Sequence, residues 1–416
     1  MIVAPSRNVQ ALRISPDRLL RRLEELAAIG RSAEGACCRL ALTDEDRAGR
    51  DQVVAWMREA GLQVRIDAIG NIFGLREGAQ DIAPVMTGSH IDTVRTGGKY
   101  DGNLGVLAGL EVCRTLDDAG IRTRRPLVVG VFTNEEGARF APDMLGSLAY
   151  VGGLGLEEAL EARDIDGNRV GDELRRIGYA GDAPMGVHRP HAFVELHIEQ
   201  GPVLDHEGGV IGVVENLQGI SWQEATIVGQ SNHAGTTPMR LRHDAGYCAA
   251  AIGTFLRGLA RDLGEHQVCT MGLVKLHPNL INVIAARATV TIDMRNTDES
   301  VLREAERRLA AYLAELSRAE GVTITTRSLA RFEPVTFDAA VAATIDACAR
   351  RLGHTPRRMT SGAGHDAQMI ARIAPAAMIF VPSVRGISHN PAEHTEPGHL
   401  AAGADVLLQA LVGLTA

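Results

Sequence analysis

Hydrophobic and polar positions form two kinds of pattern along the chain, and the order of these patterns predicts the fold. Short apolar runs bounded by glycine, proline and polar residues predict strands, whereas longer amphipathic runs predict helices. Residues 16–60 have helical periodicity, with an N-cap signal at Thr43 before three acidic residues. Expected strands follow at 63–67, 72–76, 84–88, 126–133 and 192–198, with a helix over 103–116. This alternation predicts an α/β fold with a mainly parallel sheet covered on both faces.

The pattern changes after Gly208. The expected elements are a strand over 221–228, a helix over 244–263, strands over 268–275 and 283–294, a helix over 299–320 and a strand over 322–327. The order β-α-β-β-α-β is that of a ferredoxin-like α+β unit. The α/β pattern resumes after Phe337, with a strand over 376–381 and a helix from Pro397. We therefore expect one domain in two segments, 1–212 and 331–416, with a second domain over 213–330 inserted between them.

The composition is that of a large globular chain and excludes several partners. With 416 residues, 45% of them hydrophobic and 23% charged, the chain has ample material for two cores. A net charge of −8 argues against nucleic acid and anionic membranes as partners. No apolar run approaches the roughly 20 residues of a membrane span. Six cysteines without CxxC spacing, and no apolar signal region, predict a reduced cytoplasmic protein.

Two adjacent carboxylates, Glu135 and Glu136, follow the apolar run that begins at Leu127. In an open α/β sheet they would lie at the carboxyl edge, where sites form. Neighbouring carboxylates repel each other unless a cation divides them. A bound metal resolves the conflict if one carboxylate is a ligand and the other remains free as a base. The pair therefore predicts a metal-dependent site.

Candidate partners for this pair occur at or beyond other strand ends: His90, Asp101, His197 and His389. With Glu136 they could hold two divalent ions that share Asp101, and this mixed ligation suits zinc, manganese, cobalt or nickel better than calcium. Asp92 could orient the His90 ring. Each residue taken alone equally suits a turn, a solvated surface or a core position. The interpretation depends on all of them occurring together.

Six segments together resemble one known family. They are GSHIDT (88–93), GGKYDGNLGV (97–106), TNEEG (133–137), ELHIEQGP (195–202), NHAGTTPM (232–239) and SGAGHDA (361–367). The resemblance is to the amidase and carbamoylase branch of the M20 metallopeptidases, which includes N-carbamoyl-L-amino-acid hydrolases, allantoate amidohydrolases and β-ureidopropionases. It implies a catalytic domain with an inserted lid and dimerisation domain. It also implies that Glu135 is the general base and that Asp101 bridges two metal ions.

The resemblance also implies residues that bind a small ureido acid. Arg295 would clamp the substrate carboxylate, for which a guanidinium has suitable fork geometry. Asn282 would be a second polar contact, and Gln200 would hydrogen-bond the ureido group or only hold its strand end. Gly364 would let substrate approach the backbone, although a plain loop equally uses glycine there.

In similar enzymes the histidine equivalent to His233 enters the active site of the partner subunit, so the resemblance implies a homodimer. His233 would then donate a hydrogen bond to the oxyanion that forms during hydrolysis. His365 and Asp366 are possible supporting groups around the ligands. His394 could support His389 or could be a solvated loop residue.

The expected activity is hydrolysis of the carbamoyl C–N bond of an N-carbamoyl-L-amino acid, giving amino acid, ammonia and carbon dioxide. Allantoate and N-carbamoyl-β-alanine remain alternative substrates, since few pocket residues would distinguish them. An M20-type aminopeptidase or an N-acyl-amino-acid deacylase is a more distant alternative. A third class of function is a metal-free binding or scaffold protein, and the complete set of candidate ligands argues against it.

Overall fold

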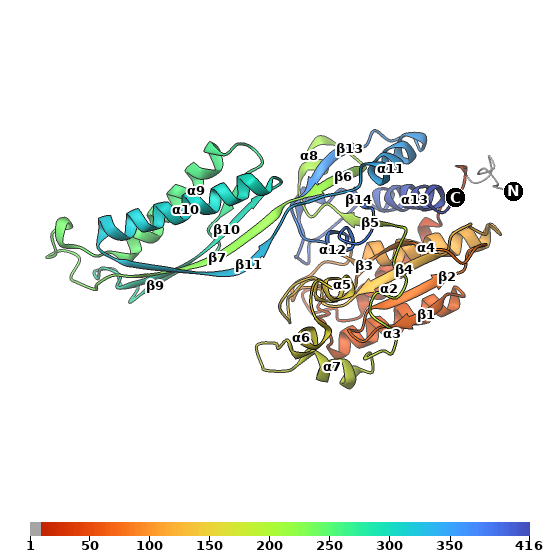
Figure 1. Cartoon of the computed structure of the whole chain (residues 1–416), viewed down its shortest axis with the longest axis horizontal. Helices are drawn as coiled ribbons and strands as arrows, with labels where there is room; N and C mark the ends of the chain where they lie inside the picture. The colour runs from red at the N-terminus through yellow and green to blue at the C-terminus, as the bar shows by residue number, and fades with distance from the viewer. Residues whose placement is uncertain (1–9) are drawn as a thin grey trace. The chain divides into compact units, whose positions relative to one another are not determined.

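The computed structural model describes residues 10–416. They form two compact units, one up to Glu215 and again over Phe337–Ala416, the other over Asn216–Thr336 (Figure 1). The insert expected over 213–330 corresponds to the second unit, which begins and ends a few residues later than expected. Strand β6 (Gly212–Leu217) first pairs with the larger sheet, and β11 (Thr323–Phe332) runs further than the strand expected there.

The larger unit is built on a mixed sheet with strand order β1-β2-β4-β3-β5-β14-β6-β12, in which β13 also pairs with β6. Its other strands are β1 (Gln63–Ile66), β2 (Ile72–Arg76), β3 (Val85–His90), β4 (Leu127–Phe132), β5 (Ala192–Ile198), β12 (Val335–Thr336), β13 (Arg357–Ser361) and β14 (Ala376–Val381). The central four, β4-β3-β5-β14, are parallel, and the strands beside them are antiparallel. The predicted α/β fold with a parallel centre is confirmed.

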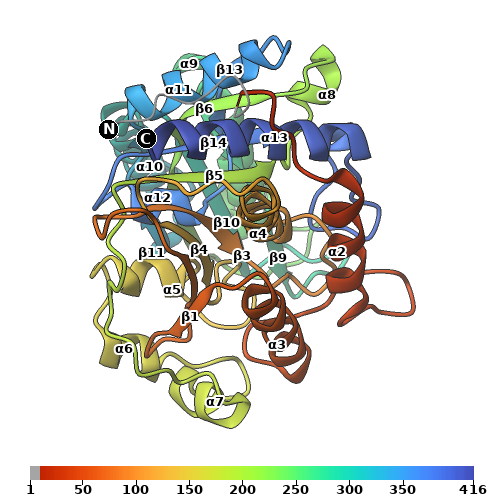
Figure 2. The ribbon, with the colours of Figure 1, turned by 90° about the vertical axis from the view of Figure 1, so that its right-hand side faces the viewer.

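Helices cover both faces of this sheet (Figure 2). Consecutive side chains of β5 point to opposite faces of the sheet. Leu196 points to the face covered by α13, where it approaches Gly403, and Glu195 points to the other face, where it binds the backbone of α12. The helices are α2 (Pro16–Ala28), α3 (Asp44–Glu59), α4 (Asn103–Asp118), α5 (Leu145–Tyr150), α6 (Leu156–Glu161), α7 (Val170–Ile177), α8 (Val203–Glu207), α11 (Ala339–Arg351), α12 (Asp366–Ile370) and α13 (Pro397–Leu414), with a 3₁₀ turn η2 (Val384–Gly386).

Helix α13 is the one helix of residues 10–416 that is long and apolar enough to cross a membrane. It instead packs against β5, β14, α4 and α11. Its apolar composition is therefore that of a core helix.

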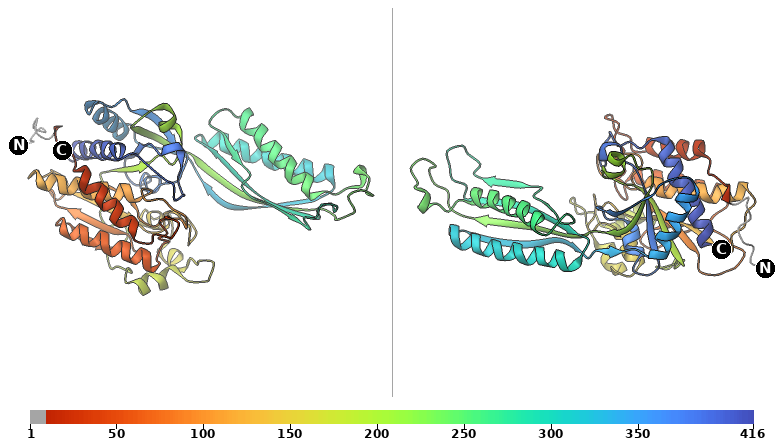
Figure 3. Two further views of the ribbon diagram at one scale, coloured as in Figure 1. Left: turned by 180° about the vertical axis from the view of Figure 1, so that it is seen from behind. Right: turned by 90° about the horizontal axis from the view of Figure 1, so that it is seen from above.

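The smaller unit has strand order β11-β7-β10-β8, with β9 also pairing with β10, and helices α9 and α10 along its sheet (Figure 3). Its other elements are β7 (Gly219–Val228), η1 (Met239–Leu241), α9 (Ala245–Asp262), β8 (Val268–Thr270), β9 (Val274–His277), β10 (Arg287–Asn296) and α10 (Glu299–Glu320). The single strand expected over 268–275 is wrong. Residues 271–273 oppose only two residues of β10, and this bulge divides the strand into β8 and β9.

Candidate metal centre and active site

The candidate ligands lie where the four parallel strands end. His90 is the last residue of β3, Glu135 and Glu136 follow β4, His197 is near the end of β5, and His389 lies beyond β14. Parallel strands bring their carboxyl ends to one edge of a sheet. Asp101 reaches the same edge because its loop connects β3 to α4.

Asp101 lies at the centre of this group, and its two oxygens face different partners. Oδ1 is 3.2 Å from His197 Nε2 and 3.7 Å from His90 Nε2. Oδ2 is 3.3 Å from His389 Nε2, and that nitrogen is also 3.3 Å from Glu136 Oε2. The five predicted ligands therefore form two triads that share one carboxylate, His90–Asp101–His197 and Asp101–Glu136–His389.

This donor set fits divalent metal ions. Each triad combines imidazole nitrogen with carboxylate oxygen, the mixture that zinc and its transition-metal neighbours prefer. A carboxylate that offers one oxygen to each of two triads is the arrangement by which two-metal sites share a ligand. The residues present can therefore hold metal as predicted.

Hydrogen bonds to backbone carbonyls determine which ring nitrogen of His90 and of His197 faces the site. His90 Nδ1 lies 2.9 Å from the carbonyl oxygen of Asp92, and His197 Nδ1 lies 2.9 Å from that of Ile198. A carbonyl can only accept, so each Nδ1 holds a proton and Nε2 faces the site. Asp92 contacts the spare nitrogen of His90 as expected, and it does so through its backbone oxygen. The Asp92 carboxylate instead accepts the backbone N–H groups of Glu135 (3.3 Å) and Glu136 (3.4 Å).

The backbone is constrained at this edge of the sheet. Among the non-glycine residues with a left-handed backbone, three adjoin or belong to the candidate ligands: Asn134 (φ 55°), Gln200 (φ 58°) and His389 (φ 54°). Such conformations cost free energy and gather at functional sites. Glycine is required at position 102 for two reasons. Its φ of 66° is left-handed, and a Cβ there would lie 2.4 Å from the His90 ring.

Two fully buried arginines hold the loops that carry the ligands. Arg39 donates to the carbonyl of Ile91 (2.7 Å), next to His90, and to Asn103 Oδ1 (2.7 Å) at the start of α4. Arg50 donates to Thr133 Oγ1 (3.2 Å), just before the glutamate pair. Sequence reasoning missed both arginines, because nothing local distinguishes a buried arginine from a solvated one.

Glu135 lies inside the group without belonging to either triad. Its Oε2 is 3.4 Å from His90 Nε2, and only 8% of the residue is exposed. Burial raises the pKa of Glu135 well above its usual value, and the charges of Asp366, Glu136 and Asp101 raise it further. A buried carboxyl with a raised pKa beside candidate metal ligands has the properties of a general acid and base.

Gln200 contacts the group through its amide. Its Nε2 donates to Asp101 Oδ2 (2.9 Å), while its buried Oε1 has no hydrogen-bond partner among residues 10–416. Gly364 lies before α12, where an added Cβ would be 3.1 Å from Met144 Cε.

The three possible supporting groups, His365, Asp366 and His394, differ in burial. The His365 ring is 4.6 Å from that of His197, and its Nε2 is 2.9 Å from Ser361 Oγ. Burial lowers the pKa of His365 well below its usual value, so the ring is neutral. Asp366, next to it, is also fully buried. His394 lies at the surface, where it is 3.4 Å from Glu396.

His233, Asn282 and Arg295 belong to the smaller unit, at two different ends of its sheet. The backbone of His233 bridges to Val283, and the N–H of Ala234 donates to the carbonyl of Asn282 (3.0 Å), so these two loops lie side by side. Arg295 pairs with Ile220 at the opposite end of β10. Its guanidinium donates to the Asp293 carboxylate at 2.9 Å and lies 5.8 Å from the Trp222 ring.

Sequence reasoning missed three supporting residues of the metal centre, Glu195, Ser388 and Glu393. Glu195 is fully buried, where it accepts from Ser89 Oγ (2.6 Å) and from the backbone N–H of Ala367 (2.8 Å). Ser388 and Glu393 flank His389 and contact the Asp101 loop. Glu195 and Glu393 occur beside predicted ligands in the sequence, but only the fold shows what they bind.

Metal binding should release protons and weaken as the pH falls. Burial alone would lower the pKa of His90, but Asp92, Glu136 and Asp101 raise it to about 9, and hydrogen bonds to Asp101 and Glu136 raise that of His389 to about 11. Near neutral pH both rings therefore carry a proton that an ion must displace. Below these pKa values, the apparent association constant should rise about tenfold per pH unit for each proton displaced.

Calorimetric titration with manganese near neutral pH, in two buffers of different ionisation enthalpy, measures the protons released. Replacing the surface residue His394 by alanine is the control and should leave the number unchanged. A heat that does not depend on the buffer would contradict the expectation.

Comparison with known proteins agrees with the motifs. Residues 86–412 match the profile of peptidase family M20/M25/M40. N-carbamoyl-L-amino-acid amidohydrolases of Rhizobium meliloti and Geobacillus stearothermophilus are 42% and 40% identical, over 99% and 95% of this chain and 98% and 97% of theirs. Relatives named allantoate amidohydrolase, from Bacillus subtilis, and ureidoglycolate hydrolase, from Oryza sativa, are 36% and 35% identical, over 94% and 97% of this chain and 96% and 85% of theirs.

A solved structure supports the same assignment. The hydantoinase/carbamoylase family amidase of Burkholderia multivorans superposes with a TM-score of 0.94 at 44% identity, covering 97% of this chain and 99% of its own. The predicted resemblance is thus confirmed by sequence and by fold. The chain belongs to peptidase family M20/M25/M40, within its amidase and carbamoylase branch.

Proposed function

We propose that this chain hydrolyses the carbamoyl C–N bond of N-carbamoyl-L-amino acids. The observation that carries the proposal is the shared Asp101, whose two oxygens face two ligand triads, with the uncommitted Glu135 beside them. The names of two relatives, 42% and 40% identical to this chain, indicate the substrate class.

We propose that each subunit holds two divalent ions, of zinc, manganese, cobalt or nickel. His90, Asp101 and His197 would hold one, and Asp101, Glu136 and His389 the other. Bound ions at such a site lower the pKa of water and withdraw electrons from a carbonyl oxygen. Their positive charge also lowers the pKa of Glu135, which makes its carboxylate available as a base.

Glu135 moves the proton in the proposed reaction. Its carboxylate takes a proton from the water that attacks the carbamoyl carbon, and then gives it to the nitrogen that leaves. The C–N bond to the amino acid breaks, which releases the free amino acid and carbamic acid. Carbamic acid decomposes to ammonia and carbon dioxide, so one water is consumed and all atoms are accounted for.

Gln200 supports recognition of the ureido group. Its Nε2 is committed to Asp101, which leaves Oε1 as a buried acceptor with no partner among residues 10–416. A carbamoyl NH₂ can donate to that oxygen, whereas the methyl of an N-acetyl group cannot. This difference favours ureido acids over N-acyl amino acids.

His233 is prepared to stabilise the oxyanion. Its Nδ1 accepts the backbone N–H groups of Gly235 (3.0 Å) and Thr236 (3.2 Å). The proton of the neutral ring is therefore on Nε2, and the exposed ring can donate from that atom to a developing negative charge. Asn282, on the adjoining loop, would contact the substrate from the same side.

We propose that His233 and Asn282 act on the partner's active site in a homodimer. Ala288 to Arg295 of β10 spans about 23 Å, and the His233 loop lies beyond the Ala288 end. Arg295 lies at the end where the chain enters and leaves the unit, next to Ile220. One copy therefore does not bring His233 and Arg295 to one small substrate, whereas two copies could.

The surface of the smaller unit supports a dimer. Of the eleven exposed large hydrophobic residues in 10–416, ten lie in this unit, and Ile281, Met239 and Leu280 are the most exposed of these. An apolar surface of this kind is typical of an interface. We propose that the unit is the lid and dimerisation domain expected from the sequence, and that the enzyme is cytoplasmic, where its six free cysteines remain reduced.

Replacing Arg295 by alanine should raise KM about 30- to 150-fold and lower kcat less, because a charge-assisted bidentate bond of about 2–3 kcal/mol is lost from bound substrate. Steady-state kinetics with an N-carbamoyl amino acid and with its carboxamide measure the effect. The wild type should lose a similar factor on the carboxamide, and the variant should not distinguish the two substrates. An unchanged KM would remove Arg295 as the clamp.

A substrate panel tests the function. Ammonia release is measured with N-carbamoyl-L-amino acids, N-carbamoyl-β-alanine, allantoate and ureidoglycolate, each with manganese, cobalt, nickel and zinc, and dipeptides and N-acetyl amino acids are assayed alongside. We expect the highest kcat/KM for an N-carbamoyl-L-amino acid. Higher values for allantoate, ureidoglycolate or N-carbamoyl-β-alanine would reassign the substrate within the branch, and dipeptide cleavage alone would overturn the proposal.

A further inference from the structure

Glu393 is a buried carboxylate that joins two loops of the metal centre. It is 4% exposed and forms no ion pair with any residue of 10–416. Its Oε1 accepts the backbone N–H groups of Tyr100 (2.9 Å) and Asp101 (3.3 Å). Its Oε2 lies 3.1 Å from Ser388 Oγ. The Asp101 loop is thus attached to the loop that carries His389.

Ser388 extends this connection to the bridging carboxylate. Its Oγ is 3.1 Å from Asp101 Oδ2 as well as 3.1 Å from Glu393 Oε2, so one hydroxyl lies between two carboxylates. Asp101 Oδ2 is the oxygen that faces His389. Ser388 therefore connects the Glu393 carboxyl group to the oxygen of Asp101 that faces His389.

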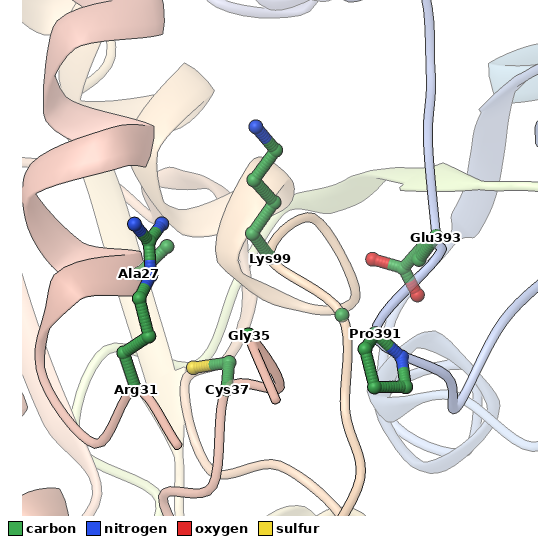
Figure 4. Close-up of a pocket in the computed structure, with 8 residues that line it drawn as sticks. Ala27, Arg31, Gly35, Cys37, Lys99, Pro391 and Glu393 are labelled. Atoms are coloured by element: carbon green, nitrogen blue, oxygen red, sulfur yellow. The ribbon is translucent and has the colours of Figure 1, made fainter. Parts of the chain in front are cut away.

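The two loops approach each other too closely for a larger residue at the contact. A Cβ on Gly98 would lie 2.1 Å from Glu393 Cδ. Figure 4 shows the Glu393 carboxylate directed toward the loop that carries Lys99, at the edge of a cavity of about 130 Å³ that Pro391 and Cys37 also line. Burial without an ion pair is costly for a carboxyl group, so its retention here calls for a role.

The two triads differ in how firmly their ligands are held. His90 and His197 lie on the buried strands β3 and β5. Glu136 and His389 lie on loops, and the His389 side chain is 49% exposed with a left-handed backbone. Sites on strands are positioned more accurately than sites on loops. The triad of Asp101, Glu136 and His389 is therefore the one that needs additional support.

We propose that Glu393 is a positioning residue that, together with Ser388, fixes Asp101 Oδ2 against His389 and so sets the affinity for the ion bound by Asp101, Glu136 and His389. This inference rests on the proposed two-ion function. It assigns Glu393 no contact with substrate or with the reacting atoms.

The test measures binding of manganese to the full-length protein by competition with a fluorescent chelator. Ser388→Ala and Glu393→Ala should each weaken one of the two ions about 10- to 100-fold and leave the other unchanged, the usual effect of losing a supporting hydrogen bond. Glu393→Gln should stay within about threefold of the wild type, because its amide accepts from Tyr100 and Asp101 and donates to Ser388. Glu396→Gln, an exposed carboxylate on the same loop, is the matched control and should have no effect.

Circular dichroism and thermal melting separate positioning from folding. Wild-type affinity for both ions in folded Ser388→Ala and Glu393→Ala protein would overturn the inference and leave the proposed function intact. Equal weakening of both ions, with a lowered Tm and no rescue by Glu393→Gln, would show a merely structural role and would also overturn it. A wild-type protein that binds fewer than two ions would overturn the inference together with the two-ion proposal.

Discussion

Replacing Glu135 by glutamine should reduce kcat about 10³-fold or more while both metal ions stay bound. The amide keeps the size of the side chain but cannot accept a proton from water, and general acid–base catalysis contributes about 10²–10⁴-fold. Ammonia release measures turnover, and metal analysis of the same dialysed sample measures occupancy.

The adjacent residue provides a matched control for this prediction. Glu136 faces His389 at 3.3 Å and belongs to a ligand triad, whereas Glu135 belongs to neither. Glu136→Gln should therefore lose metal, and partial activity should return with excess manganese. If Glu135→Gln loses metal as Glu136→Gln does, Glu135 is a ligand, and if it turns over normally, it is not the base.

Three of the five candidate ligands could be predicted from the sequence because a parallel sheet places them by rule. His90, Glu136 and His197 follow from apolar strands that end in polar residues, and such ends meet at one edge. Asp101 and His389 lie on loops, where no spacing rule applies. Their residue types made them candidates, and the resemblance to the M20 family made them expected ligands. The structure then brings all five into two triads.

Supporting residues could not be predicted in the same way. Their function depends on contacts between distant segments, such as Glu393 with the backbone of Tyr100, 2.9 Å apart. The bulge between β8 and β9 was also missed, because apolar periodicity does not show how many residues oppose each other across a sheet. Asp92 was expected to orient the His90 ring, but the sequence did not indicate that its backbone oxygen rather than its side chain makes the contact.

Mixing two inactive variants should restore activity if His233 acts in trans. As homodimers, His233→Ala and Glu135→Gln should each have strongly reduced turnover. In a mixed dimer, the subunit with His233→Ala keeps its own Glu135 and receives His233 from its partner, so one of the two sites is complete. Random exchange makes half of the dimers mixed, and we expect recovery of roughly a quarter of wild-type activity.

Asn282 and Arg295 provide opposite controls in the same assay. Asn282→Ala mixed with Glu135→Gln should also regain activity, because the backbone of Asn282 is hydrogen-bonded to that of Ala234, next to His233. Arg295→Ala mixed with Glu135→Gln should gain none, because the clamp is proposed to act within its own subunit and both sites then stay defective. The physical reason for this difference is distance. Arg295 lies about 23 Å along β10 from Ala288, and the loops of His233 and Asn282 lie beyond the Ala288 end.

The mixtures are prepared by co-expression with two affinity tags, so that mixed dimers can be isolated and their ammonia release measured per dimer. Purified mixed dimers should then show about half of wild-type turnover for the His233 pair. Activity confined to the Arg295 mixture would reverse the assignment of the two ends of the sheet. No recovery in any mixture, with dimers present by light scattering, would place His233 in its own subunit's site or outside catalysis.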